Sequence, residues 1–171
     1  MGHIANKIVA KDKKLADILF GQRYKIDLFQ REYRWERTQI EALISDLVTS
    51  FQKSYKDGDN IEEYETYDCY YMGPLVLCED KGALSIIDGQ QRLTSFTLLL
   101  IFLHHLQIKL NISEDLSKDI MPYLYIKKGG KTSLVINVES RDSIIKELIE
   151  NPNNIYSRME ERFDDLDESW Y

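Results

Sequence analysis

One segment constrains the fold of this chain more than any other. An apolar run at 84–87 stops at residues 88–92, which read DGQQR, and an almost unbroken apolar stretch follows at 93–108. This order predicts a strand that turns through a glycine into a helix. A helix that is apolar on nearly every face is buried on most sides. We therefore expect the helix after the DGQQR segment to be the largely buried centre of the core.

The size and charge of the chain limit the kinds of protein that it can be. With 171 residues, 43% hydrophobic and 30% charged, the chain can bury one core, and we expect a domain over 1–150. Residues 151–171 would begin a following helical segment or linker of a larger protein. The net charge of -7 argues against a basic nucleic-acid coat protein. Two cysteines without metal spacing, no signal peptide and no membrane-length apolar run predict a cytoplasmic protein without membrane contact.

The remaining elements follow from hydrophobic periodicity and capping residues, and they predict an α+β fold. The clearest helix spans 36–55, with an apolar stripe that should face the core. A hairpin over 75–87 should lead into the DGQQR segment. In other parts of the chain, Asp12, Ser113 and Ser140 are the expected helix N-caps. We expect further helices at 12–20, 113–121, 141–150 and 155–163, and strands at 24–29, 70–79, 84–87, 123–126 and 133–138.

Residues 29–35, FQREYRW, mix aromatic and charged side chains without a clean period, which predicts a loop. Two interpretations stay open from the residues alone. Gln30, Arg31 and Arg34 could face a phosphate-bearing ligand, with Tyr33 and Trp35 packing behind them. Alternatively, the loop closes the core and its arginines form surface ion pairs.

The DGQQR segment also has two interpretations. Asp88 and Gln91 are spaced as in a capping box, which requires no ligand. The same geometry suits phosphate, because Gly89 lets the backbone approach closely and Arg92 offers a charged fork. Asp88 could then hold a divalent cation or a water, and Gln90 or Gln91 could position that water.

Together the two segments resemble a known family. Residues 86–94, with DGQQR at their centre, are similar to the signature of the N-terminal domains of GmrSD-type modification-dependent restriction enzymes, which are ParB-like domains. Residues 29–35 resemble the family's Q-R-x-Y-x-W segment, and 71–77 its strand before the hairpin. The segment 134–149, with Asn137 and Asp142, resembles its strand and helix. The likeness covers most of residues 13–150.

The resemblance implies a ParB/sulfiredoxin-type fold, a small mixed sheet packed with helices. It implies binding and hydrolysis of a nucleoside triphosphate through the DGQQR loop, coupled to cleavage or sensing of modified phage DNA. A C-terminal nuclease domain or partner chain would be required, because no such motif occurs here. The residues carried over to the nucleotide and catalytic loop are Asp88, Gly89, Gln90, Gln91 and Arg92, with Gln30 and Arg31 beside it.

The first hypothesis is therefore an Mg²⁺-dependent NTPase domain of an anti-phage enzyme. Arg92 and Arg31 would contact phosphates, Asp88 would hold the metal, Gln91 would orient water, and Thr94 would line the nucleotide site. A metal-dependent DNA nuclease using the same loop is one alternative. Another is a non-enzymatic reader of modified DNA. In either DNA-binding role, the expected contacts come from Tyr33, Arg34 and Trp35.

Overall fold

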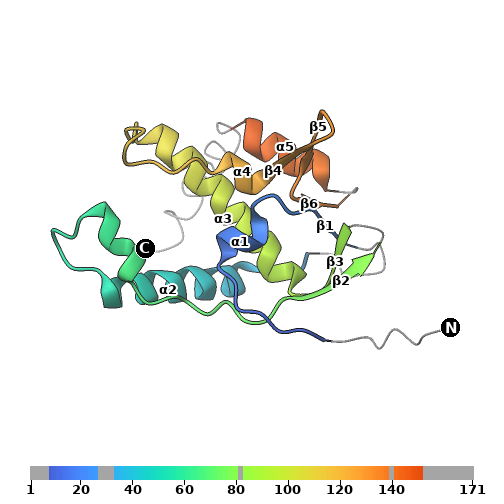
Figure 1. Ribbon diagram of the computed structural model, residues 1–171. Coiled ribbons are helices and arrows are strands. Elements are labelled where there is room, and N and C mark those ends of the chain that lie inside the picture. Colours follow the sequence, from blue (N-terminus) through green and yellow to red (C-terminus); the bar gives the residue numbers. More distant parts are fainter. Residues whose placement is uncertain (1–7, 27–32, 81–82, 139–140, 152–171) are drawn as a thin grey trace, which may run out of the picture.

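The computed structural model describes residues 8–26, 33–80, 83–138 and 141–151. It shows an α+β fold with a small mixed sheet and packed helices, as the sequence predicts (Figure 1). The helices are α1 (Leu15–Leu19), α2 (Arg37–Ser54), the 3₁₀ helix η1 (Ile61–Thr66), α3 (Gln90–Lys109), α4 (Met121–Leu124) and α5 (Asp142–Glu150). The strands are β1 (Tyr24–Lys25), β2 (Val76–Asp80), β3 (Ala83–Asp88), β4 (Tyr125–Lys128), β5 (Lys131–Leu134) and β6 (Ile136–Asn137).

The main sheet has the order β2-β3-β1-β6. Strands β2 and β3 form the predicted antiparallel hairpin, while β1 lies parallel to both of its neighbours. Strands β4 and β5 form a second, two-stranded sheet with a turn at Gly129-Gly130 between them. Strand β3 of the main sheet therefore leads directly into α3.

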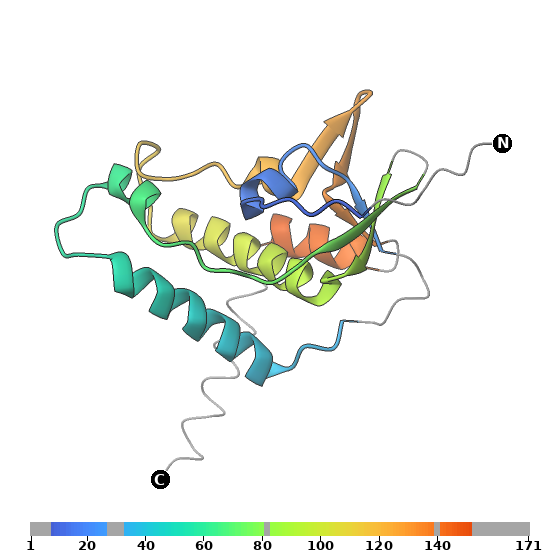
Figure 2. The same ribbon diagram turned by 60° about the horizontal axis from the view of Figure 1, so that its bottom comes forward.

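The core has two clusters, and α3 contributes to both. Leu93 packs with buried side chains from α1, β1 and β3, and Ile101 packs with side chains from α4, β5 and α5. In two views α3 runs between α2 and the elements α1 and α4 (Figure 2). Its burial is one-sided, however, because Leu103 and Ile108 are exposed. The expectation that this helix is buried on most sides holds only for part of it.

The expected helix over 36–55 is confirmed as α2. Glu36 is its N-cap and forms a capping box with Gln39, whose Oε1 accepts the Glu36 N–H at 3.0 Å. The apolar stripe of α2 is only partly covered: Leu43 is buried, while Val48 and Phe51 are exposed. Phe51 contacts the rings of Tyr55 and Tyr67 instead of the core, so this end of α2 packs locally.

Several predicted elements near the N-terminus are wrong in extent. The helix predicted over 12–20 is limited to α1, whose N-cap is Lys14 and not Asp12. Lysines crowd this end at 11, 13 and 14, and positive charge is unfavourable at a helix N-terminus. Of the strand predicted over 24–29, β1 covers Tyr24–Lys25, Ile26 lies outside it, and residues 27–29 lie outside the described ranges.

The strand predicted over 70–79 begins only at Val76. Gly73 adopts a left-handed φ of 89° and Pro74 has no N–H to donate, so the chain cannot pair there. The acidic segment after Gly58 contains η1. Its start is fixed by a capping box in which Glu63 accepts the Asn60 N–H at 2.9 Å.

The helix predicted over 113–121 is absent. Ser113 begins a turn instead of capping a helix: its carbonyl accepts the N–H groups of Leu116 and Ser117. Pro122 lies in the first turn of α4, a position that suits proline, and does not follow a helix end. The helix predicted over 141–150 is confirmed as α5, with Arg141 at its N-cap. Ser140 and the helix predicted at 155–163 lie outside the described residues.

No helix in the described ranges is long and apolar enough to cross a membrane.

Because the phenol of Tyr24 is buried, the stability of the domain should decrease at alkaline pH. Its side chain is 2% exposed and its hydroxyl donates to the Ile18 carbonyl at 2.6 Å. Burial raises the pKa of Tyr24 to about 12, from an ordinary value of 10.0. The unfolded chain therefore loses this proton first, and about 3 kcal/mol of stability should be lost as the pH rises through that interval. Urea unfolding at several pH values checks this, and Tyr24→Phe should reduce the alkaline loss.

Candidate functional site

The turn between β3 and α3 requires a glycine at position 89. Gly89 is the N-cap of α3 with a left-handed φ of 93°. A Cβ at this position would lie 2.8 Å from Leu75 Cδ1 and 3.3 Å from the Pro74 carbonyl oxygen. Because Gly89 and not Asp88 is the N-cap, and no side chain caps the helix, the capping-box interpretation of Asp88 and Gln91 is wrong.

The guanidinium of Arg92 is held in place beside the first turn of α3. Its Nη1 donates to the Met72 carbonyl at 2.8 Å, and its guanidinium packs on Gly73. A Cβ on Gly73 would lie 2.1 Å from that Nη1 atom. Arg92 is thus positioned by a segment about twenty residues earlier in the chain.

Asp88 ends β3 one turn before Arg92. Asp88 Oδ2 lies 3.7 Å from Arg92 Nη2, while the Asp88 side chain is 68% exposed and that of Arg92 is 24% exposed. Such an open pair adds little to folding stability. It places a solvent-facing carboxylate beside a held cation at the positive end of the α3 dipole.

The second motif packs on the same turn. The Arg34 N–H donates to Gln91 Oε1 at 2.8 Å, and the hydroxyls of Tyr33 and Ser95 lie 3.0 Å apart. Ser95 Oγ donates to the Gln91 carbonyl at 2.9 Å, so Tyr33 is the donor to Ser95. The structure therefore brings Tyr33 and Arg34 to the start of α3.

Of the other members of the second motif, only Trp35 lies in the described residues. Trp35 is half-buried in the loop that precedes α2. Gln30 and Arg31 lie outside the described residues.

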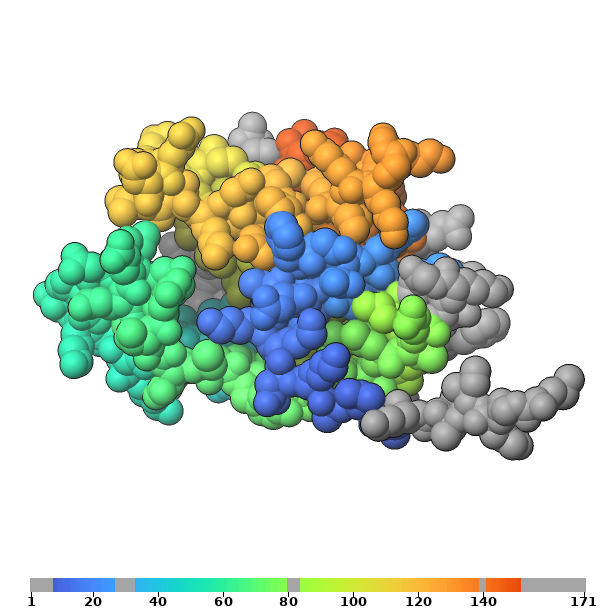
Figure 3. Space-filling model, in the orientation of Figure 1, coloured from blue at the N-terminus to red at the C-terminus, as the bar shows by residue number. Residues whose placement is uncertain are grey.

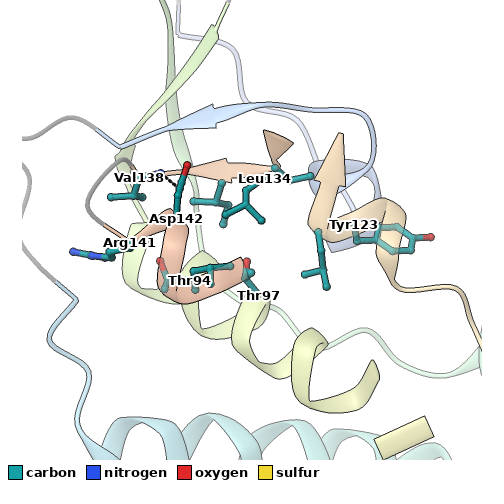
Figure 4. Close-up of a pocket in the computed structure, with 11 residues that line it drawn as sticks. Thr94, Thr97, Tyr123, Leu134, Val138, Arg141 and Asp142 are labelled. Carbon is teal, nitrogen blue, oxygen red and sulfur yellow. Dashed lines mark hydrogen bonds between the residues drawn. The ribbon is translucent and has the colours of Figure 1, made fainter. Parts of the chain in front are cut away.

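Thr94 lies on a different side of the first turns of α3. It lines a small, mostly apolar cavity with Thr97, Arg141 and Asp142 (Figure 4). The Asp142 carboxylate accepts the Val138 N–H at 2.8 Å and the amide of Asn137, which closes one wall. The cavity volume of about 30 Å³ has room for a water but not for a nucleoside.

Within the described ranges, no group of three His, Cys, Asp or Glu side chains is arranged to bind a metal. Asp88 is the carboxylate of the DGQQR segment, and its exposure leaves it open to a cation carried by a ligand. This fits Mg²⁺, which commonly uses one or two carboxylates together with substrate phosphates and waters.

Sequence patterns did not identify three contributors to the site: the Met72 carbonyl, Gly73 and Ser95. The Gly73-Pro74 pair inside an otherwise apolar run was the available signal, because glycine in a strand marks a bulge or a close approach. The partner that approaches, Arg92, is not visible from local spacing. Ser95 carried no signal beyond its polarity.

Comparison with known proteins adds the family. No curated protein matches the sequence. Residues 12–170 match the family described as GmrSD restriction endonuclease, N-terminal domain, and this match includes both motifs and almost the whole chain. The chain therefore belongs to the family of GmrSD restriction endonuclease N-terminal domains.

Proposed function

We propose that this domain binds a nucleoside triphosphate with Mg²⁺ at the start of α3 and hydrolyses it. The family places the domain in a restriction and defence context. In our proposal the hydrolysis is coupled to the recognition or cleavage of modified phage DNA by a C-terminal nuclease domain or partner. The fold that we propose for the sheet and its helices is of the ParB/sulfiredoxin type.

The observation that carries the proposal is the pairing of Asp88 with Arg92 across the Gly89 turn. The two side chains lie 3.7 Å apart at the N-terminus of the longest described helix. Helix N-termini attract anions, and a guanidinium binds phosphate oxygens through two parallel hydrogen bonds. An exposed carboxylate beside it would repel a bare phosphate, but it suits a phosphate that brings a divalent cation.

Each residue has a distinct proposed role. Arg92 would bind phosphate oxygens through the donors that Met72 does not occupy, since a guanidinium has five. Asp88 would hold Mg²⁺, which would neutralise charge on the phosphates. Gln91 accepts the Arg34 N–H, which supports a role in holding the 33–35 loop. Gln90 would then orient the attacking water.

The remaining predicted residues keep peripheral roles in the proposal. Gln30 and Arg31 would approach the phosphates from the loop before Tyr33. Thr94 would support the site from the small cavity without contacting the base. Arg34 and Trp35 would face DNA, whereas the hydroxyl of Tyr33 is held by Ser95 and its ring would pack behind them.

Removing the charge of Asp88 tests this assignment. Asp88→Asn keeps the shape of the side chain but loses the metal-binding charge, so Mg²⁺-dependent turnover should fall about 100-fold or more. Because Asp88 is exposed, the free energy of unfolding should change by less than about 0.5 kcal/mol. Release of labelled phosphate from ATP, GTP and CTP measures turnover, and urea unfolding measures stability.

Asp46→Asn is the matched control, since Asp46 is exposed on α2 and the chemical change is identical. It should retain full turnover. The proposal is wrong if the wild-type chain neither binds nor hydrolyses any of the three nucleotides, or if Asp88→Asn turns over as fast as wild type.

A further inference from the structure

We propose that the β4–β5 hairpin is a contact surface for duplex DNA. The inference rests on the proposed function in one respect, namely that the domain acts on DNA. It assigns the contact to residues outside the DGQQR site, on an element that neither motif includes.

The hairpin is anchored at its root and free at its tip. Leu134 is buried at the root, and the backbone is tied there by Val135 N–H to the Leu124 carbonyl at 2.9 Å. Among the described residues, its strands pair only with each other, and the hairpin projects from the molecule on the side opposite α2 (Figures 1 and 2). It forms part of the outer edge in the space-filling view (Figure 3). A rigid root with a projecting tip suits insertion into a groove.

Every charged residue in the exposed part of the hairpin is basic. Lys127, Lys128 and Lys131 are all exposed, and residues 120–138 contain no Asp or Glu in a chain with net charge -7. At the root, Glu150 lies close enough to Tyr125 to act on it electrostatically. Burial first, and then the charge of Glu150, raise the pKa of Tyr125 there. The positive charge at the tip is therefore a local feature against an acidic background.

Two of these lysines are placed against each other. Lys128 and Lys131 are direct cross-strand partners beside the Gly129-Gly130 turn. Like charges in this position destabilise a hairpin, because their Cβ atoms lie only about 5 Å apart. Within the described ranges, the ion pairs found do not involve these lysines. The pair therefore lowers the stability of the isolated domain, and binding a polyanion would relieve the repulsion.

Duplex DNA fits the tip better than a small anion does. A two-stranded ribbon matches the width of the major groove, and its tip here carries no side chain on Gly129 or Gly130. Lysines on both faces of the ribbon can reach phosphates on both sides of a groove. Because these contacts go to phosphates, they would give affinity and orientation without sequence preference.

Salt-dependent binding tests the hairpin. A labelled 20-base-pair duplex would be titrated with the 171-residue chain without nucleotide, at several KCl concentrations, by fluorescence anisotropy. The triple variant Lys127→Ala, Lys128→Ala, Lys131→Ala should bind about tenfold more weakly at low salt. Its slope of log K against log salt should be shallower by about 3, one unit for each lost phosphate contact. The matching Lys→Arg triple variant should bind as wild type does, because it keeps the charge.

The chain offers a control with the same change in net charge. Lys11, Lys13 and Lys14 are exposed before α1, and replacing all three by alanine should leave the salt slope unchanged. The proposal is overturned if both alanine variants lose the same slope, if the hairpin variant binds like wild type, or if the wild type does not bind duplex DNA. Equal competition by a poly-glutamate peptide would also overturn it, since the tip would then bind any polyanion.

NTP turnover, measured without DNA, separates this proposal from the previous one. The hairpin variant should retain full turnover, since none of its lysines belongs to the DGQQR site. If the hairpin variant loses DNA binding but keeps full NTP turnover, the loss is caused by the hairpin lysines alone. Absent turnover in a wild type that still binds DNA through these lysines would contradict only the nucleotide site.

Discussion

Gly73→Ala is expected to reduce NTP turnover about 100-fold, although position 73 lies outside both sequence motifs. A Cβ there would lie 2.1 Å from Arg92 Nη1, so the guanidinium must leave the Met72 carbonyl and its place beside Asp88. The flexible side chain can move without disturbing the core. The change should therefore affect catalysis more than stability. Phosphate release and urea unfolding of the same preparation measure both quantities.

Gly58→Ala is the control for backbone strain. Gly58 has a φ of 92°, close to the 89° of Gly73, but a Cβ at Gly58 would meet no atom within 4 Å. Both variants should lose about 1 kcal/mol of stability from left-handed backbone strain. Only Gly73→Ala should lose turnover. Equal turnover in the two variants would show that the position of Arg92 has no part in the reaction.

Leu93→Ala is expected to lower the free energy of unfolding by about 3–4 kcal/mol, the largest stability effect considered for this chain. Leu93 is 0% exposed and packs with Leu19, Tyr24, Ile86 and Val135, so its removal leaves a cavity where α1, α3 and the sheet meet. In a domain of this size the midpoint of thermal unfolding should fall by roughly 10 °C. Differential scanning calorimetry measures this shift directly.

Leu110→Ala provides the comparison at the other end of the helix. Leu110 is 60% exposed at the C-cap of α3, and its replacement should change the free energy of unfolding by less than about 0.5 kcal/mol. If Leu93→Ala were no more destabilising than Leu110→Ala, the first turn of α3 would not be part of the core. The positions of Arg92 and Gln91 would then lack the rigid support described above.

The strand, glycine turn and helix at 83–109 could be predicted because their signals are local. Apolar residues end abruptly at Asp88, and a glycine separates two elements of different period. The second motif was predicted as a loop, and its described residues, 33–35, have no regular secondary structure. The contacts that join the motifs could not be predicted. Tyr33 and Ser95 are 62 residues apart, and hydrophobic periodicity carries no information about contacts between residues so distant in sequence.

The wrong predictions have local causes as well. The spacing of Leu15, Ile18 and Leu19 favours a helix, but the lysines before it shorten that helix to five residues. At Ser113 a favourable capping residue precedes a turn, because capping patterns also fit turns that never extend. Sequence patterns indicate which residues favour the start of a helix, but tertiary packing determines where helices begin.

The central place of β1 in the sheet sets an order of assembly. Tyr24 pairs with Leu84 on one side and with Ile136 on the other, so β1 is synthesised before both of its partner strands and must wait for them. Closing these long loops is entropically costly and slow. During synthesis the hairpin β2–β3 and helix α3 can form first, but the sheet is complete only after residue 137. A chain that stalls before that point would expose one edge of β1, and with it a template for pairing with other chains.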